Sequence, residues 1–422
     1  MNNKNIGLLY FQDLQKNIFK KVINSNDDLT YIRRIASESI LDWLNIIDYR
    51  HNNKINGYKP FIHLRDSVAY VKYLNKIILF DAIKNLNLDH FREGEILAVL
   101  ITHAHNDHID KLPAVLENYP NAKIVMSEIT FKIIYEVWSS KDMYREIEML
   151  NRNKILVSNN DEIEIDYYTI LSYSSGHCMG GLSYFVFNDD WAGGIGFIGE
   201  FTARAVGGFS HSIPKLKNII SLILDGKSFN DDNLLPQGIA EFNWDSIYKC
   251  LSRDYLKCRI PIFQAYSLGA LQELFFICAN ALANGVNDNL KEIINIGTER
   301  KTIITEMKKL KSFEYEVGFS EQKRVKENTI NIFTGNNFNG LFYEIYNKYK
   351  DREELKWFVP QESNIINSDM ETYEIYTHPS KSEVIEMIFS LDPENVYLIN
   401  SYNISFKYKN ILENLKFKVF YD

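Results

Sequence analysis

Three histidines and one aspartate fall within six residues of the sequence, at His103, His105, Asp107 and His108. They follow an apolar stretch that is typical of a buried strand. In an extended backbone, alternate residues such as His103 and His105 point to the same side. A turn after them lets Asp107 and His108 approach the same point from a second direction. Imidazole nitrogens and carboxylate oxygens are ligands that zinc and similar divalent ions prefer. The spacing therefore predicts that one segment serves two adjacent metal ions. The alternative is a polar loop, which would gather three of nine histidines here without a role.

The elements around this segment alternate between strands and helices. Apolar residues spaced three to four apart predict helices at 111–119 and 131–149. Short apolar runs between polar turns predict strands at 68–74, 76–81, 95–102, 123–126, 169–173, 182–187, 196–198 and 219–224. Alternating helices and buried strands indicate an α/β sandwich rather than a helical bundle.

The beginning of the chain and its second half have other patterns of apolar residues. In residues 1–57 the apolar residues recur every three to four positions, as in helices, which predicts a helical accessory extension. Residues 245–311 are mostly helical in pattern, with an isolated strand at 259–263. Strand-like runs resume at 329–333, 374–376, 396–400 and 416–420. The length of 422 residues exceeds the usual size of one domain, so we expect two domains or one domain with a large insertion.

Composition excludes several classes of protein. Glycine and proline are too few for a collagenous or linker-rich chain. No apolar run is long enough to span a bilayer, and the first residues lack the apolar core of a signal peptide. The four cysteines form no CxxC pair, which indicates reduced thiols and a cytoplasmic protein without membrane contact. The net charge of −8 argues, taken alone, against a protein that coats nucleic acid.

The histidine cluster and three further segments resemble the metallo-β-lactamase superfamily, whose signature is HxHxDH after a strand. Asp81 ends an earlier strand, as the family's first conserved-motif aspartate does. The sequence Ser-Gly-His-Cys-Met-Gly-Gly at 175–181 is similar to the third motif, and Gly199-Glu200 stands where the family has Gly-Asp. The resemblance implies an αββα sandwich that binds two Zn²⁺ ions.

The resemblance also implies a role for each residue. His103, His105 and His177 would hold the first ion, and Asp107 and His108 the second. Glu200 would bridge the two ions, and Asp81 would orient ligands without binding metal.

Later segments resemble the β-CASP branch of this superfamily, which processes nucleic acids. The run Ile-Ser-Leu-Ile-Leu-Asp that ends at Asp225 is similar to the branch's acidic motif. Residues 268–274 resemble its LGRxQEL segment, Thr334-Gly335 stands near its Ser-Gly-Met loop, and the sequence around His378 resembles SGHASxxEL. The resemblance covers residues 60–420. It implies a β-CASP-like α/β domain at 231–360, inserted between the two parts of the sandwich domain at 58–230 and 361–422.

Three positions depart from the family pattern. Asn400 stands where the family has a second C-terminal histidine that ligates the second metal. An amide oxygen is a harder ligand than imidazole, so Mn²⁺ or Mg²⁺ could replace zinc there. Glu200 adds one methylene to the bridging carboxylate, and Ala270 replaces the arginine of LGRxQEL, which weakens an inferred phosphate contact.

The resemblance implies a metal-dependent phosphodiesterase that cleaves RNA or single-stranded DNA by metal-activated water. Asp107, His378 and Asp225 would be its catalytic residues, with His378 as general acid and Asp225 holding its ring. One alternative is a hydrolase of a small molecule. The other is a degenerate, non-catalytic subunit of a nucleic-acid-processing or defence complex. The loss of the family's ligand types at Asn400 and Glu200 favours this alternative, whereas the complete HxHxDH argues against it.

Charge then constrains how nucleic acid could bind. Residues 231–360 contain 17 basic and 18 acidic residues, and basic side chains cluster at 308–326. The cluster could form a track for a single strand, or simply a solvated helix face. His211, in a loop near the predicted site, is more simply a solvent-facing histidine than a ligand. The extension at 1–57 could bind a partner protein or a second copy of the chain.

Overall fold

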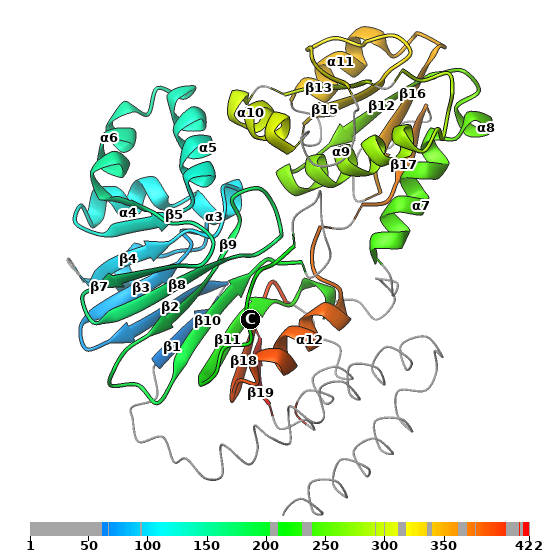
Figure 1. Ribbon diagram of the computed structural model, residues 1–422. Coiled ribbons are helices and arrows are strands. Elements are labelled where there is room, and N and C mark those ends of the chain that lie inside the picture. Colours follow the sequence, from blue (N-terminus) through cyan, green and yellow to red (C-terminus); the bar gives the residue numbers. More distant parts are fainter. Residues whose placement is uncertain are drawn as a thin grey trace, which may run out of the picture.

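The computed structural model describes the chain from residue 61 onward. The described residues are 61–65, 67–92, 95–202, 210–229, 239–291, 293–298, 300–310, 318–335, 340–361, 369–375, 377–401, 413 and 417–421. The predicted extension at 1–57 lies outside them, so its role stays a prediction. Two sheets lie face to face, and a third sheet with its own helices lies to one side (Figure 1).

The first sheet has six strands in sequential order. They are β1 (Phe61–Arg65), β2 (Val68–Tyr73), β3 (Lys76–Phe80), β4 (Ile96–Leu100), β5 (Lys123–Met126) and β6 (Lys154–Leu156). Strands β1 to β3 are antiparallel, whereas β3 to β6 are parallel. Parallel neighbours need crossover connections. These contain η1 (Leu88–His90), α3 (Asn106–Ile109), α4 (Leu112–Asn118), α5 (Glu128–Ser139) and α6 (Tyr144–Asn153). Helices α4 to α6 cover the outer face of the sheet.

The second sheet has seven strands in the order β19-β18-β11-β10-β9-β8-β7. They are β7 (Asp161–Ile165), β8 (Tyr168–Ser174), β9 (Leu182–Phe187), β10 (Gly194–Gly199), β11 (Ile219–Asp225), β18 (Asn395–Ile399) and β19 (Lys418–Tyr421). Strands β7 to β10 are antiparallel, and β10, β11, β18 and β19 are parallel. Helix α12 (Lys381–Leu391) packs on the outer face.

Aromatic and aliphatic side chains fill the space between these two sheets. Phe80 of the first sheet stacks on Phe197 of the second, with ring centroids 4.5 Å apart. The hydroxyl of Tyr184 donates to the carbonyl oxygen of Ile101 at 2.8 Å, which ties β9 to the loop after β4. Helices on both outer faces and a shared apolar core confirm the predicted α/β sandwich.

The third sheet has six parallel strands in the order β14-β13-β15-β12-β16-β17. They are β12 (Ile260–Ala265), β13 (Ile293–Gly297), β14 (Gly318–Glu321), β15 (Ile330–Thr334), β16 (Leu355–Pro360) and β17 (Met370–Tyr373). One face packs against α7 (Ile239–Leu251), α9 (Leu268–Ala283) and α10 (Lys301–Leu310), and the other against α11 (Leu341–Tyr349). Two short helices, η2 (Lys227–Phe229) and α8 (Arg253–Leu256), complete the described elements.

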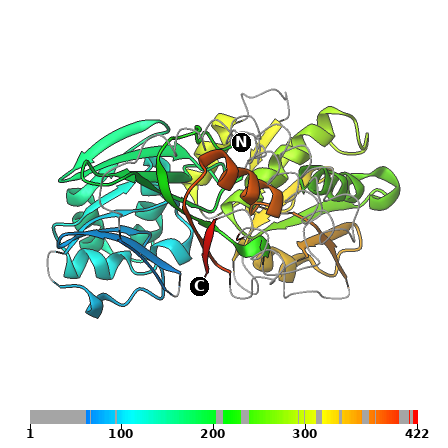
Figure 2. The ribbon, with the colours of Figure 1, turned by 90° about the horizontal axis from the view of Figure 1, so that it is seen from below.

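The third sheet is inserted in the sequence between β11 and β18 of the second sheet. It includes β17, so it extends past residue 360, the limit that we predicted for the inserted domain. Figure 2 shows the sandwich and the third sheet as two lobes side by side. No helix among the described residues combines the length and apolar character that crossing a membrane requires.

Several local predictions differ from the structure. Glu374 and Ile375, part of the strand predicted at 374–376, follow the end of β17 and are not in a strand. The predicted helix at 131–149 is two helices, α5 and α6, because Asp142 has a left-handed backbone with φ of 56° between them. The mostly helical pattern at 245–311 contains β13, which we did not predict. Its five residues are buried or half-buried, and a short apolar run in a buried parallel strand has no alternation to distinguish it from a helix.

Candidate metal centre

The HxHxDH segment follows the end of β4, and its Asp107 and His108 lie in the short helix α3. Backbone hydrogen bonds fix it against the end of β3. The N–H of Asp81 donates to the carbonyl oxygen of Leu100, and the N–H of Ala82 donates to that of His108. Asp81 has φ of 57°, a left-handed conformation that turns the chain directly after β3. The structure thus brings Asp81 beside the histidine segment.

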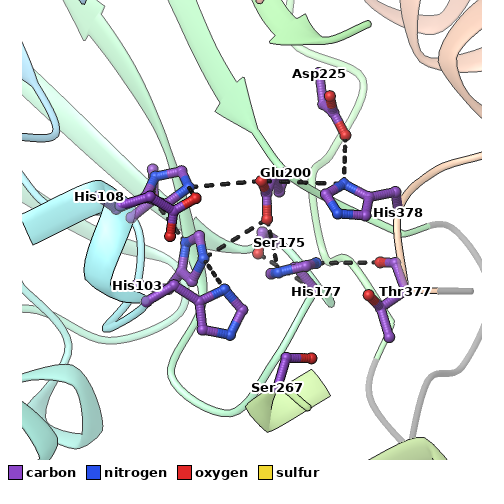
Figure 3. Close-up of polar contacts among 12 residues, drawn as sticks. His103, His108, Ser175, His177, Glu200, Asp225, Ser267, Thr377 and His378 are labelled. Atoms are coloured by element: carbon purple, nitrogen blue, oxygen red, sulfur yellow. Dashed lines mark hydrogen bonds and ion pairs between the residues drawn. The ribbon is translucent and has the colours of Figure 1, made fainter. Parts of the chain in front are cut away.

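A first cluster joins four of the predicted ligands. One atom each from His103, His105, His177 and Glu200 lies within 4.8 Å of the others. The Nε2 of His103 is 2.7 Å from the Nδ1 of His105, and the Nε2 of His177 is 2.8 Å from the Oε2 of Glu200. His177 comes from the turn between β8 and β9, and Glu200 directly follows β10. Figure 3 shows His103 and His177 converging on Glu200.

A second cluster consists of Asp107, His108 and Glu200, again within 4.8 Å. The Nε2 of His108 is 3.5 Å from the Oε1 of Glu200 and 3.8 Å from the Oδ2 of Asp107. Glu200 therefore presents Oε2 to the first cluster and Oε1 to the second. Its extra methylene does not prevent it from reaching both.

Hydrogen bonds on the far side of the rings determine which nitrogens face the clusters. The Nδ1–H of His108 donates to the Oδ2 of Asp81 at 2.8 Å, and the Nδ1–H of His177 donates to the carbonyl oxygen of Thr377 at 3.1 Å. The hydroxyl of Thr102 donates to Asp81 and so can only accept from the Nδ1–H of His103, at 3.0 Å. Each bond leaves Nε2 as a lone-pair donor, the form that a metal ion requires.

Burial and neighbouring charges set the protonation of these groups without metal. Burial and the adjacent imidazoles lower the pKa of His103 well below its ordinary value, and they lower that of His105 to about 3. Burial would also lower the pKa of His108, but Asp81 and Glu200 raise it well above its usual value. Burial opposes ionisation of Glu200, yet the surrounding histidines hold its pKa well below its ordinary range.

These residues fit a pair of divalent cations. The Nε2 of His105 is buried and makes no hydrogen bond with the part of the chain that the structure describes. A buried nitrogen without a partner is costly unless something else occupies its lone pair. The first cluster has three imidazoles and the carboxylate of Glu200, and the second has a fourth imidazole, the carboxylate of Asp107 and the same Glu200. Such groups match the ligands that Zn²⁺ binds.

His378 and Asp225 lie on the other side of Glu200 from the first histidines (Figure 3). The Nδ1–H of His378 donates to the Oδ2 of Asp225 at 2.8 Å, and the same nitrogen is 4.0 Å from the Oε1 of Glu200. Burial would lower the pKa of His378, but Glu200 and Asp225 raise it above its ordinary value. Two of the three predicted catalytic residues, His378 and Asp225, are therefore together beside the clusters, and the third, Asp107, belongs to the second cluster.

Asn400 follows the last residue of β18, Ile399, which pairs with Asp225 of β11. It has a left-handed backbone with φ of 60°, a conformation that asparagine adopts more readily than most residues. The structure thus places Asn400 at the same end of the second sheet as Asp225. Its role as a ligand stays a prediction, as does the choice of metal at the second cluster.

A cleft of about 450 Å³ separates the histidine loop from the third sheet. The carboxyl ends of three parallel strands form one wall, at Ser267 after β12, Thr298 after β13 and Thr334 at the end of β15. His105 and Asp107 line the facing side. In open parallel sheets, ligands bind in such crevices at the carboxyl ends of the strands.

Several residues that shape this site belong to no motif that we predicted to bind metal or act in catalysis. Thr102 and Thr377 act through a hydroxyl and a carbonyl oxygen, and their only sequence signal is that each directly precedes a singled-out histidine. Arg300 lines the cleft, and no pattern marks it. Ala270 is fully buried in the apolar core, so its position lies inside the fold rather than on the cleft wall.

His211 has a structural contact rather than a place in either cluster. Its Nδ1 accepts from the N–H of Ile213 at 3.2 Å, and its own N–H donates to the carbonyl oxygen of Thr202. A Cβ at Gly176, whose φ is 74°, would lie 2.5 Å from the N of His211. The His211 backbone therefore packs against the turn that carries His177. We interpret His211 as a support for that turn.

One solved structure has a similar fold over most of the chain. It is a crystal structure described as a protein of unknown function from Enterococcus faecalis V583, with 13% sequence identity and a TM-score of 0.52. The match covers 86% of this chain and 96% of that chain. No curated protein matches the chain significantly. At this identity the likeness concerns the fold alone.

A family comparison agrees with the geometry of the site. The matched segment begins in the turn after β2 and ends within β9. It contains Asp81, the whole HxHxDH segment and His177. Together with the two clusters of potential ligands, the match indicates a metal-dependent hydrolase. Residues 74–185 match the model of the metallo-beta-lactamase superfamily.

Proposed function

We propose that the protein is a metal-dependent phosphodiesterase that hydrolyses RNA or single-stranded DNA. When bound, the metal ions would supply Lewis acidity, which makes water a stronger nucleophile near neutral pH and stabilises negative charge on a phosphoryl group. His103, His105 and His177 would hold one ion, Asp107 and His108 the other, and Glu200 would contact both.

His378 is the residue best placed to give a proton to the departing sugar oxygen. Asp225 accepts its Nδ1–H, so Nε2 is the nitrogen that can carry the exchangeable proton. Glu200 and Asp225 favour the protonated ring, which is the form that a general acid needs. Asp225 is fully buried and also accepts the N–H of Lys227, so its position is fixed.

The cleft carries the proposal of a phosphate-containing polymer. The helices that follow β12 and β15, α9 and α11, begin at the carboxyl edge of the third sheet, so their N–H groups point toward this side. Helix N-termini and Arg300 favour an anion beside the ligands His105 and Asp107. A small neutral ester would use neither. This is the feature that separates the nuclease proposal from a hydrolase of small uncharged molecules.

The third domain supports the same proposal. It is inserted between β11, which ends at Asp225, and the segment that contains His378. The resemblance to the β-CASP branch places an inserted domain at this point of the chain. The predicted basic face is weaker than its sequence suggests, because Lys308 pairs with Glu321 at 3.1 Å and Lys309 with Glu306 at 2.6 Å. We therefore expect contact with nucleic acid mainly inside the cleft.

A cleavage assay tests the proposal. The full-length protein, loaded in turn with Zn²⁺, Mn²⁺ and Mg²⁺, is incubated with end-labelled single-stranded RNA and DNA. We expect shortened products with at least one metal, and none with a His103→Ala variant or with a chelator. Intact strands under all three metals would exclude the nuclease. Hydrolysis of only a small phosphodiester would favour the small-molecule alternative.

A further inference from the structure

The turn that carries His177 contacts the third domain as well as the sandwich. The N–H of Met179 donates to the Oε1 of Gln272 in α9 at 2.8 Å. The carbonyl oxygen of His177 is 2.7 Å from the point where a Cβ at Gly269, also in α9, would lie. Cys178 and Met179 belong to the same apolar cluster as α9. One helix of the inserted domain thus packs directly on a predicted ligand segment.

We propose that α9 positions the metal ligand His177, with Gln272 and Gly269 as the positioning residues. Metal binding at the first cluster and docking of the third domain are then linked. The inference needs only the first cluster to bind metal. It does not depend on which bond the protein hydrolyses.

Gln272 is an unusual residue for its surroundings. It is 1% exposed, among apolar side chains of α9 and its neighbours. Its Nε2 is buried and makes no hydrogen bond with the described atoms. Burying an amide with one half unsatisfied is unfavourable, so packing alone would favour an apolar residue here. The bond from Met179 is the contact that accounts for a glutamine at this position.

Gly269 is unusual for a related reason. It is the second residue of a 16-residue helix, where alanine would form helix more readily. A side chain here would press on the His177 carbonyl oxygen, which is part of the backbone and cannot rotate away. The glycine therefore lets the N-terminal turn of α9 approach the ligand turn closely.

The opposite side of His177 is fixed by the chain that leaves the third domain. Its Nδ1–H donates to the carbonyl oxygen of Thr377, shortly after β17 and directly before His378. The ring and the backbone of His177 are thus both held by segments that belong to or adjoin the third domain. If docking of the third domain strengthens metal binding, metal binding strengthens docking by the same free energy. Loosening α9 should therefore weaken metal binding.

The test measures zinc affinity without nucleic acid, by competition with a chromophoric chelator. Gln272→Met keeps the length of the side chain and removes the strong acceptor. We expect about 10-fold weaker zinc binding at the first cluster, the lower end of effects seen for residues behind metal ligands. Gly269→Ala should weaken binding as well, although alanine favours the helix. The visible absorption spectrum of bound Co²⁺ should change in both variants.

Gln264→Met is the matched control. Gln264 is equally buried in the same domain, and it donates to the carbonyl oxygen of Gly335 rather than to the His177 turn. It should lose stability without losing zinc affinity. Wild-type zinc affinity and an unchanged Co²⁺ spectrum in Gln272→Met would overturn the inference. An equal loss of affinity in Gln264→Met would overturn it too. If Gln272→Met does not fold, the zinc affinity and Co²⁺ spectrum of Gly269→Ala decide the question.

Discussion

At the scale of single residues, the acceptors behind the rings decide whether the histidines can bind metal. Asp81, Thr102 and the carbonyl oxygen of Thr377 each take the Nδ1–H of one ring and leave its Nε2 unprotonated. Of these acceptors Asp81 takes the most hydrogen bonds, because it accepts from His108 and from both the N–H and hydroxyl of Thr102. Its charge and geometry therefore influence both clusters.

Asp81→Asn should weaken metal binding at the second cluster by about 10- to 100-fold. Asparagine tolerates the left-handed backbone at this position, with φ of 57°, so the fold should survive. The amide loses the negative charge, and its NH₂ group cannot accept a hydrogen bond, so only one side-chain oxygen remains to accept from His108 and Thr102. Metal content after dialysis and a zinc titration would measure the loss. Asp161→Asn is the control, because Asp161 caps a backbone N–H at Ser158 far from the clusters. Equal metal binding in wild type and Asp81→Asn would contradict the prediction.

His378→Asn should slow cleavage of a natural phosphodiester by about 10²- to 10⁴-fold, the usual contribution of a general acid. The same variant should lose far less activity on an aryl phosphodiester, because an acidic phenol leaves without needing a proton. Asparagine can still donate to Asp225, which keeps that buried carboxylate satisfied. Rates on the two substrates, each compared with wild type, give the test. His90→Asn, at an exposed histidine of η1, should leave both rates unchanged. Equal losses on both substrates would show that His378 has another role.

Most of the metal ligands could be predicted from the sequence because they lie in one short segment. His103, His105, Asp107 and His108 need only a strand and a turn to converge, and both are local features. The prediction of His177 and Glu200 depended on a resemblance, since they follow other strands far along the chain. Gln272 and Thr377 could not be predicted in this way. They act across the domain boundary, and nothing in their neighbours indicates which turn they would face.

At the scale of elements, strand order decides what lies on the cleft. Strands β12 and β15 are neighbours, yet the helices after them, α9 and α11, pack on opposite faces of the sheet. Such a divergence opens a crevice at the carboxyl ends. Sequence patterns located β12 and β15 but not β13, β14 or β16. Pattern alone also cannot give the order of strands in a parallel sheet, because each crossover can pass over a neighbour.

Glu136 of α5 links the sandwich to the N-terminus of α10 in the third domain. Its carboxylate accepts from the N–H of Lys301 at 2.5 Å and from that of Thr302 at 3.0 Å. Glu136→Gln should destabilise the protein by about 1 kcal/mol, through the lost cap and the lost charge at a helix N-terminus. Urea denaturation followed by circular dichroism would measure it. Glu148→Gln removes an exposed pair with Arg152 on α6 and should have a smaller effect. The reverse order of the two effects would refute the link.

At the scale of the whole molecule, the metal centre joins segments that are far apart in the sequence. The histidine loop extends from the first sheet, and His177 and Glu200 come from the second. The chain then passes through the entire third domain before it returns with His378. A ligand set of this kind does not exist in the unfolded chain, so metal binding and folding are coupled. The acidic net charge of −8 is compatible with this centre, because bound cations bring positive charge to the site itself.

Removing the metal should therefore lower thermal stability. Zinc at about 100 times its dissociation constant stabilises the folded state by about 2.7 kcal/mol. With the usual unfolding entropy per residue, this corresponds to a melting temperature about 3 °C higher for a chain of this size. Calorimetry with zinc and with a chelator would measure the shift. His177→Ala removes one ligand of the first cluster and should reduce the shift, whereas His90→Asn, at an exposed histidine outside both clusters, should retain it. If zinc and chelator give the same melting temperature, the two clusters do not bind metal in the folded protein. The hydrolase and the positioning role of α9 would then both fail.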